Sequence, residues 1–537
     1  MHWRTGLLAS VLVVMMALVG VGVREVGAPG AEALSGEVGT VRFRTSSAPA
    51  VQADFERALA MLHSFWFSAS TSGFNAVLQR DPGCAIAHWG VAMNLLGNPF
   101  GWPPPAKNLA EGAAAVERAR ATGPKTARER DYVEALAAFY REHDTVDHRT
   151  RALAYEKAMA QLAARYPADR EATVLYALAL NATALPTDKT YANQLKAAGL
   201  LESVFAEQPK HPGVAHYLIH SYDYPPIAAK GLKAARLYAG IAPAAPHALH
   251  MPSHIFTRRG YWQESIESNR ASAAAAMNDF DRFHAMDYLT YAHLQQAQDA
   301  AARRVLADML AIKKPNVEHF VVGYAAAAIP ARYALERGRW ADAARLQLPL
   351  PEIPWSRFPQ AEAILIFARG YGAARAGDAA AARQHLARLA ALRDQALTAK
   401  QTYWADQVGI KYLGLEGWIA RVEGRPEAAV RLLQEAAQRE EATEKHPVTP
   451  GPIVPARELL AELLLDLNRP AEALPEFEAT LTIEPNRLRT LVGAGRAAEL
   501  AGDRGKARQY YAQVLAVAAQ ADTERQELKH ARAFLGR

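Results

Sequence analysis

The sequence predicts an all-α fold, a solenoid in which helical hairpins stack one on another. Hydrophobic residues make up 50% of the 537 residues and aromatic residues only 8%, while alanine, the best helix former, is very abundant. Helical periodicity runs from Val51 almost to the end of the chain. Two histidine pairs repeat at one interval, because 34 residues separate His216 from His250 and His220 from His254. That interval is typical of a helix–turn–helix repeat.

The first 28 residues have the features of an export signal. Arg4 precedes an apolar run from Leu7 to Val23, and small residues follow it. We expect a cleaved signal peptide and a periplasmic or secreted protein. The alternative is an uncleaved segment that anchors the protein to the membrane. Residues 29–50 are rich in Gly, Ser and Ala, and we expect them to form a flexible spacer.

Turn glycines and small residues recur at the positions that stacked hairpins require, for example Gly260, Gly338, Gly424 and Gly502. About ten to twelve helical hairpins fit between Val51 and the C-terminus. These segments resemble the tetratricopeptide-repeat (TPR) family over nearly the whole mature chain. The resemblance implies a right-handed α-solenoid, a fold that serves many different partners.

Prolines interrupt the repeat pattern and force extended chain. The stretch 348–359 (LPLPEIPWSRFP) is expected to connect an N-terminal solenoid arm, 51–347, to a C-terminal arm, 360–537. A second break, HPVTPGPIVP at 446–455, is a candidate loop over the mouth of the solenoid channel.

The histidine pairs predict a site as well as a fold. Residues spaced i, i+4 share one helical face. Each hairpin has a first and a second helix. The TPR resemblance implies that the second, fifth, ninth and twelfth positions of each first helix line the concave surface, where ligands are held. His216 and His250 are fifth in their units, and His220 and His254 are ninth. We therefore expect four imidazoles to meet on one inner wall.

Further residues join this inner surface. His247 takes the second position of its unit and Asp223 the twelfth position of the preceding unit. The next unit carries His284, Asp287 and Tyr291.

Two alignments of that third unit are possible. In one, His284 corresponds to His250, 34 residues earlier. In the other, His284 corresponds to His247 and Tyr291 to His254. A turn at Ala297, equivalent to the turn at Gly260, favours the second.

Neutral imidazole and carboxylate are ligands for zinc, copper or iron. We predict a transition-metal site formed by His216, His220, His250 and His254. Asp223, His247, His284 and Asp287 are further ligands or supports of the ligands. A metal-free polar pocket and a histidine pattern inherited by repeat duplication are the alternatives.

Three more side chains are candidates for ligand binding on the same wall: Arg258, Tyr291 and Glu458. Glu458 and Glu462 occupy the fifth and ninth positions of a later unit. They form an inward acidic pair for a basic ligand group or an ordinary solvated face.

The sequence leaves two functional hypotheses. The first is an exported TPR solenoid whose metal site performs hydrolysis or oxidation on a small molecule, or simply holds the metal. The second is a periplasmic scaffold that binds a peptide or protein in its concave groove. The net charge of +6 is spread along the chain without a basic block, so we expect no nucleic-acid partner. The segment APHALHMPSHIFTRRGYW also resembles a bacterial group of long TPR proteins.

Overall fold

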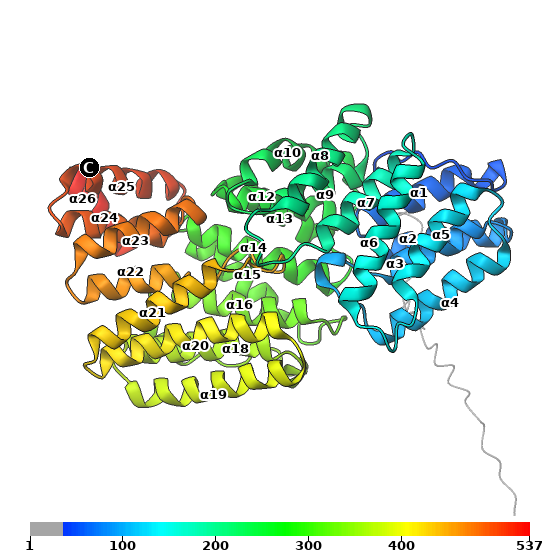
Figure 1. The fold of residues 1–537 in the computed structure, drawn as a ribbon. Coiled ribbons are helices and arrows are strands. Elements are labelled where there is room, and N and C mark those ends of the chain that lie inside the picture. Colours follow the sequence, from blue (N-terminus) through cyan, green and yellow to red (C-terminus); the bar gives the residue numbers. More distant parts are fainter. Residues whose placement is uncertain (1–35, 537) are drawn as a thin grey trace, which may run out of the picture. The chain divides into compact units, whose positions relative to one another are not determined.

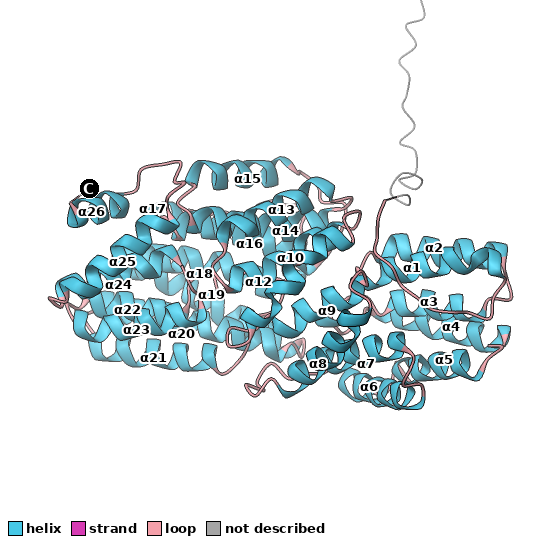
Figure 2. Ribbon diagram, turned by 90° about the horizontal axis from the view of Figure 1, so that it is seen from above, coloured by secondary structure: helices cyan, strands magenta, loops and turns pink. Residues whose placement is uncertain are grey.

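The computed structural model describes residues 36–536, and within that stretch every regular element is a helix (Figures 1 and 2). The predicted signal or anchor, residues 1–28, lies outside the described residues and stays a prediction. Among the residues that are described, no helix combines the length and apolarity needed to cross a membrane.

The N-terminal half contains the helices α1 (Gln52–His63), α2 (Phe67–Arg80), α3 (Ala85–Leu95), α4 (Ala106–Thr122), α5 (Ala127–Tyr140), α6 (His148–Arg165), α7 (Arg170–Ala182), α8 (Ala192–Glu207), α9 (Pro212–Tyr222), α10 (Leu232–Ile241), α11 (Pro246–His250), α12 (Pro252–Arg258) and α13 (Trp262–Ala275). The C-terminal half contains α14 (Asp279–Gln295), α15 (Asp299–Ala311), α16 (Phe320–Leu335), α17 (Trp340–Ala344), α18 (Pro359–Arg375), α19 (Ala379–Thr398), α20 (Thr402–Val422), α21 (Pro426–Glu441), α22 (Ala456–Asp466), α23 (Pro470–Ile483), α24 (Leu488–Leu500), α25 (Arg504–Val517) and α26 (Gln526–Leu535). Four short 3₁₀ helices lie between them: η1 (Pro49–Val51), η2 (Pro99–Gly101), η3 (Ala228–Gly231) and η4 (Trp355–Arg357).

Successive helices pack as hairpins in chain order. Pro252 has no N–H to donate, and it divides one first helix into α11 and α12. If these two are counted as one, α1 to α25 form twelve hairpins, and α26 packs against the last. The predicted all-α solenoid of helical hairpins is confirmed.

Left-handed residues end several first helices, as the turn glycines predict. Gly260 has φ +65° and Gly424 has φ +75°. Ala297 takes the same conformation, with φ +55°, at the end of α14. Ala297 is therefore the equivalent of Gly260, and this supports the alignment in which His284 corresponds to His247.

The stretch 36–50 differs from the flexible spacer that we expected. Phe43 is fully buried, and its ring lies 5.3 Å from that of Phe55 and 5.9 Å from that of Trp89. The Thr40 N–H donates a 2.9 Å hydrogen bond to the Lys210 carbonyl. Buried apolar side chains and backbone pairing fix this segment against the solenoid.

The proline-rich stretch 348–359 connects α17 to α18, but it does not separate two independent arms. Leu350, Ile353 and Trp355 are buried in a hydrophobic core that extends on both sides of it. From Glu37 onward the chain forms one compact unit.

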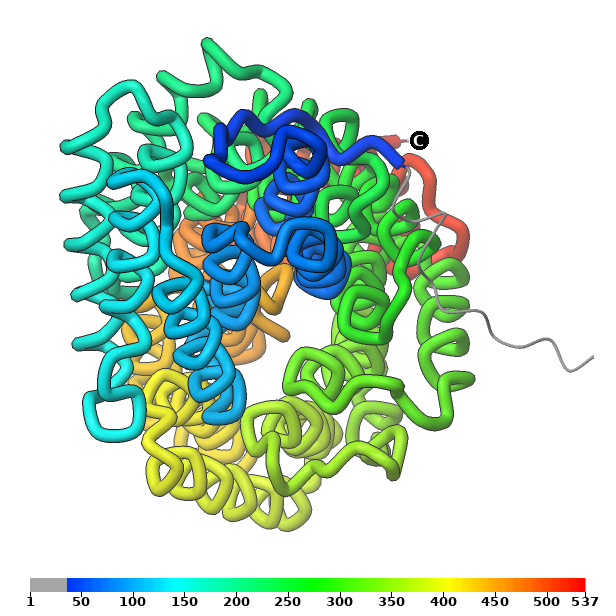
Figure 3. The backbone as a smooth tube through the Cα atoms, turned by 90° about the vertical axis from the view of Figure 1, so that its right-hand side faces the viewer, coloured from blue at the N-terminus to red at the C-terminus, as the bar shows by residue number. Residues whose placement is uncertain are grey.

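The segment between α21 and α22 returns to the middle of this unit. In Figure 3 it is part of the orange trace seen between the cyan and the green helices. Lys189 pairs with Glu444 at 2.6 Å, and Arg332 on α16 donates hydrogen bonds to Thr449 Oγ1 and the Gly451 carbonyl, both at 2.8 Å. The predicted loop is therefore held from two sides.

The turn at Gly260 gives a test of another long-range contact, with the turn between α23 and α24. A Cβ added there would lie 2.3 Å from the Pro485 carbonyl oxygen, whereas a Cβ at Gly424 would meet nothing within 4 Å. Both substitutions place alanine at positive φ, which costs about 1–2 kcal/mol. We expect Gly260→Ala to lower the free energy of unfolding by about 1–3 kcal/mol more than Gly424→Ala, through overpacking. Urea unfolding of the two variants measures the difference, and equal losses would contradict the close approach of Gly260 to Pro485.

Candidate metal centre

Three consecutive hairpins contribute one first helix each to a histidine cluster. His216 and His220 lie on α9. His247 and His250 lie on α11, and His254 lies at the start of α12. The last member, His284, lies on α14. The structure therefore brings together the four predicted histidines and adds two that the sequence had placed as possible ligands or supports.

The histidines are enclosed and do not line an open concave wall, as we had expected. Each of the six has an exposed fraction of 8% or less. The ring of Phe100 stacks on His220 with centroids 3.8 Å apart, and Phe65 covers His216 at 4.4 Å. On another side, Tyr288 lies 4.8 Å from His250. Aromatic side chains thus separate the cluster from solvent.

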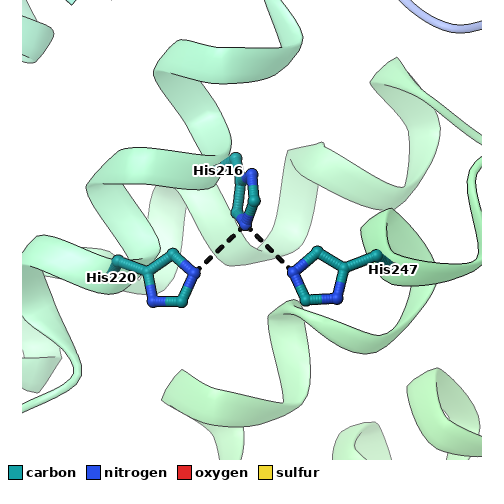
Figure 4. A group of neighbouring side chains, drawn as sticks. All are labelled: His216, His220 and His247. Carbon is teal, nitrogen blue, oxygen red and sulfur yellow. Dashed lines mark hydrogen bonds between the residues drawn. The ribbon is translucent and has the colours of Figure 1, made fainter. Parts of the chain in front are cut away.

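The six rings form two triads, each with its ligand nitrogens within 4.8 Å of one another. In the first triad, His216 Nε2 lies 3.1 Å from His220 Nε2 and 3.2 Å from His247 Nε2 (Figure 4). The second triad comprises His250, His254 and His284.

The two triads adjoin. The ring centroids of His220 and His254 are 5.9 Å apart, and those of His247 and His250 are 6.1 Å apart. Ions held by the two triads would therefore be neighbours.

Hydrogen bonds fix which nitrogen carries the proton in three of the rings. His216 donates its Nδ1–H to the His63 carbonyl at 2.7 Å, since a carbonyl only accepts. His254 donates its Nδ1–H to the Asp223 carboxylate at 2.9 Å. His250 donates to Asn269 Oδ1 at 2.7 Å, because the Asn269 amide nitrogen already donates to the Ser265 carbonyl. A neutral imidazole has one N–H, so Nε2 of each of these rings presents a lone pair.

Two such lone pairs face each other in the second triad. His250 Nε2 and His254 Nε2 are 3.0 Å apart, and neither carries a proton to share. Two acceptors this close repel unless a cation lies between them. Nitrogens that bind one ion at about 2.0–2.1 Å lie about 3.3 Å apart in a tetrahedral arrangement and about 2.9 Å apart in an octahedral one. The observed separations of 3.0–3.2 Å fit shared coordination.

A proton is a poor substitute for that cation. Burial lowers the pKa of His250 well below its ordinary value, and the neighbouring His254 lowers it further. Burial also lowers the pKa of His254, although the Asp223 carboxylate opposes this shift. The remaining member of the triad is also consistent with metal coordination, because His284 Nδ1 is buried and has no hydrogen-bond partner among the described residues.

Asp223 and Arg258 lie outside the two triads. Asp223 contacts the histidine His254, and Arg258 contacts Asp223. Asp223 accepts from His254, from Arg258 Nε at 2.8 Å and from Lys445 Nζ at 3.3 Å. Burial opposes ionisation of this carboxyl, but Lys445 and Arg258 outweigh it and hold its pKa well below the usual range. A carboxylate that accepts from a metal-ligating histidine orients the ring and raises its basicity.

A third group of possible ligands, His63, Glu171 and His211, has a different character. His63 Nε2 and His211 Nε2 both donate to the Glu171 carboxylate, at 2.9 and 2.5 Å. The other ring nitrogens accept, from the Tyr217 hydroxyl and from the Val214 N–H. Every lone pair is used, so this group is a structural network. Its connection to the centre is the His63 carbonyl, which orients His216.

The other predicted residues contact arginines and not the histidines in the hydrogen bonds and ion pairs of the described chain. Asp287 pairs with Arg332 at 2.8 Å, and both side chains are fully buried. The Tyr291 hydroxyl accepts from Arg487 at 3.1 Å. Glu458 accepts from Arg487 at 2.8 and 3.0 Å.

Glu462 meets arginines in the same way, accepting from Arg489 and Arg375. The acidic pair is neither solvated nor free for a basic ligand group, because these arginines occupy it.

Sequence reasoning missed the residues that enclose and orient the cluster: Phe65, Phe100, Asn269, Tyr288 and Lys445. Phe65 and Phe100 lie between α-helices, Asn269 lies on the second helix α13, and Lys445 lies in the segment after α21, 222 residues from Asp223 in sequence. Tyr288 lies on the first helix α14, one helical turn after His284. The His284–Tyr288 spacing and the proline-rich 446–455 break were the signals for this cover.

Comparison with known proteins adds little beyond helical repeats. No protein-family model matches the chain, and no curated protein matches it in sequence. Solved structures that resemble it include the APC/C hetero-tetramer Cut9–Hcn1, at 11% identity and TM-score 0.29, covering 91% of this chain and 96% of that one. Naa15/Naa10 bound to HypK-THB gives 14% identity and TM-score 0.25, covering 91% and 75%. The human IFIT1 dimer with PPP-AAAA gives 12% and 0.37, covering 86% and 89%. Scores this low carry no functional argument.

The buried histidines predict a pH effect on the metal-free protein. Their folded pKa values lie below the ordinary value of 6.5, so between the two values the unfolded chain binds protons that the folded chain does not. Stability is complete above pH 6.5 and falls as the pH drops below it. Each such histidine contributes about 1.4 kcal/mol per pH unit.

Urea unfolding of chelator-treated protein between pH 7.5 and 5.5 measures this slope. We expect His250→Gln to make the slope shallower by about 1.4 kcal/mol per unit below pH 6.5. An unchanged slope would mean that His250 is protonated in the folded protein.

Proposed function

We propose that this chain is a metalloprotein, a TPR-like solenoid that holds two transition-metal ions in adjoining three-histidine sites. The observation that carries the proposal is the 3.0 Å contact between the unprotonated Nε2 atoms of His250 and His254. No arrangement of the protons available to two neutral rings makes this contact favourable, and a bound ion does. The first triad repeats the same geometry with His216 at its centre.

Copper is the metal that the ligand set favours over zinc and iron. Imidazole binds all three, and copper has the highest affinity in the divalent series. Both triads consist of neutral rings, and the nearest carboxylate, Asp223, is already neutralised by Arg258 and Lys445. Two divalent ions would leave a large uncompensated charge in a buried site. Monovalent copper with three nitrogen ligands halves that charge.

The enclosure limits what can react at the centre. With 0–8% of each histidine exposed, a peptide cannot reach the histidine nitrogens in this conformation, so a reactant would have to be as small as water or dioxygen. A copper pair would exchange electrons with such a small molecule, and a zinc pair would activate water for hydrolysis. This argues against the alternative of a scaffold that holds a peptide or protein on the histidine surface.

The cellular setting of the proposal comes from the sequence. The Arg4 to Val23 segment supports export to the periplasm or beyond, or a membrane anchor if the segment is retained. Membership of the bacterial group of long TPR proteins and the lack of a nucleic-acid partner remain predictions.

Metal content tests the proposal directly. We expect about two copper ions per chain after reconstitution under reducing conditions, one for each triad. His247→Ala and His284→Ala should each remove one ion, because each change opens only one triad. Elemental analysis provides the count, and His530→Ala, at a 54% exposed side chain, is the matched control.

The other outcomes are equally clear. One ion in the wild type, lost in either variant, would replace the pair by a single shared site. No metal in the wild type after reconstitution with copper, zinc or iron would overturn the proposal. Two zinc or iron ions in competition with copper would keep the sites and refute the choice of metal.

The Asn269 amide should control one triad only. Asn269→Ala removes the acceptor that orients His250, and loss of such a partner typically lowers metal affinity about 10–100-fold. We expect that loss for one of the two ions and an unchanged affinity for the other. Titration with a competing chelator measures both steps, and equal weakening of both would show that Asn269 acts through the fold as a whole.

A further inference from the structure

A cavity of about 430 Å³ lies behind the metal centre, on the far side of the Asp223 support. Its volume is in the range of small-molecule sites. Arg258 and Lys445, which both contact Asp223, form part of its wall. The apolar part of the lining includes Tyr324, Phe367, Tyr403 and Trp404.

Most cationic side chains at this cavity have carboxylate partners. Arg258 and Lys445 both contact the carboxylate of Asp223, and Arg258 also lies 3.8 Å from Glu444. Lys189 is paired with Glu444 at 2.6 Å, and Arg457 is paired with Glu441.

Lys411 differs from these paired cations. It is partly buried in the wall, and its ammonium donates to the Gln407 carbonyl at 3.3 Å but has no ion-pair partner among the described residues. Burial lowers the pKa of Lys411 to about 8 and raises that of Glu440, its neighbour in the wall, to about 7. Glu440 therefore balances the ammonium only in part near neutral pH.

An unused polar group also lies in the wall. Gln360 is only 6% exposed, and its Oε1 atom has no hydrogen-bond partner in the described part of the chain. Buried amide groups are nearly always hydrogen-bonded, so this acceptor points to a hydrogen-bond donor, such as a hydroxyl or N–H group, on a ligand.

We propose that this cavity binds a small organic anion, with its apolar or aromatic body against Tyr403 and Trp404 and its anionic head beside Lys411. Aromatic walls supply apolar area, and an unpaired ammonium in a low-dielectric wall supplies a strong, directional partner. The proposal does not depend on the metal centre, because none of the six histidines of the two triads lines the cavity. If the centre is occupied, the Asp223 carboxylate connects the two sites.

Two fluorescent probes test this inference in the full chain: anilinonaphthalene sulfonate and phenylnaphthylamine, which shares its rings but lacks the anionic group. We expect saturable binding of the sulfonate, close to one per chain. Lys411→Met removes an unpaired charge and keeps the apolar stem, so the variant should fold. It should weaken the sulfonate at least about tenfold and change the neutral probe less than about twofold.

Lys107→Met, at a lysine with an 82% exposed side chain, is the matched control and should change neither probe. Absence of sulfonate binding to the wild type would overturn the inference. So would equal effects of Lys411→Met on both probes, or no effect on the sulfonate. Because the assay needs no metal, its result is separate from the metal count of the histidine variants.

Discussion

The buried carboxylate of Asp223 connects the histidine cluster to the segment that covers it. It lies at the end of α9 and accepts from His254 and Arg258 on α12 and from Lys445 in the returning segment. It therefore joins two neighbouring hairpins to a stretch more than 200 residues later. Removing one partner of a buried charge group costs about 3–5 kcal/mol, because the remaining charges stay desolvated.

The segment after α21 explains why a solenoid can enclose a site. Stacked hairpins normally leave their concave wall open, and a histidine there would be solvated. Here the segment after α21 closes over the wall, and Arg332, fully buried, holds it through Thr449 and Gly451. Enclosure lowers the pKa values of the rings, keeps them neutral, and so maintains them as ligands.

The contrast between the histidine groups shows what distinguishes a ligand from a structural residue. His63 and His211 are as buried as His250, but their nitrogens all have hydrogen-bond partners, and Glu171 accepts from both rings. In His250, Nδ1 is fixed as a donor to Asn269, and the lone pair of Nε2 faces the lone pair of His254 Nε2. The closeness of the side chains does not distinguish a metal ligand from a structural histidine. The positions of the ring protons do, because they show which nitrogens keep a free lone pair.

The repeat could be predicted from the sequence. The 34-residue spacing placed His216 with His250 and His220 with His254 on neighbouring first helices, because helix periodicity and stacking are local properties. Three features could not be predicted from the sequence: the division of the six rings into two triads, the contact of Glu458 with Arg487, and the cover over the histidine cluster. They depend on how the loops that carry Phe65 and Phe100, and the segment after α21, pack in the folded chain. Contacts between residues so far apart in the chain leave no periodic signal in it.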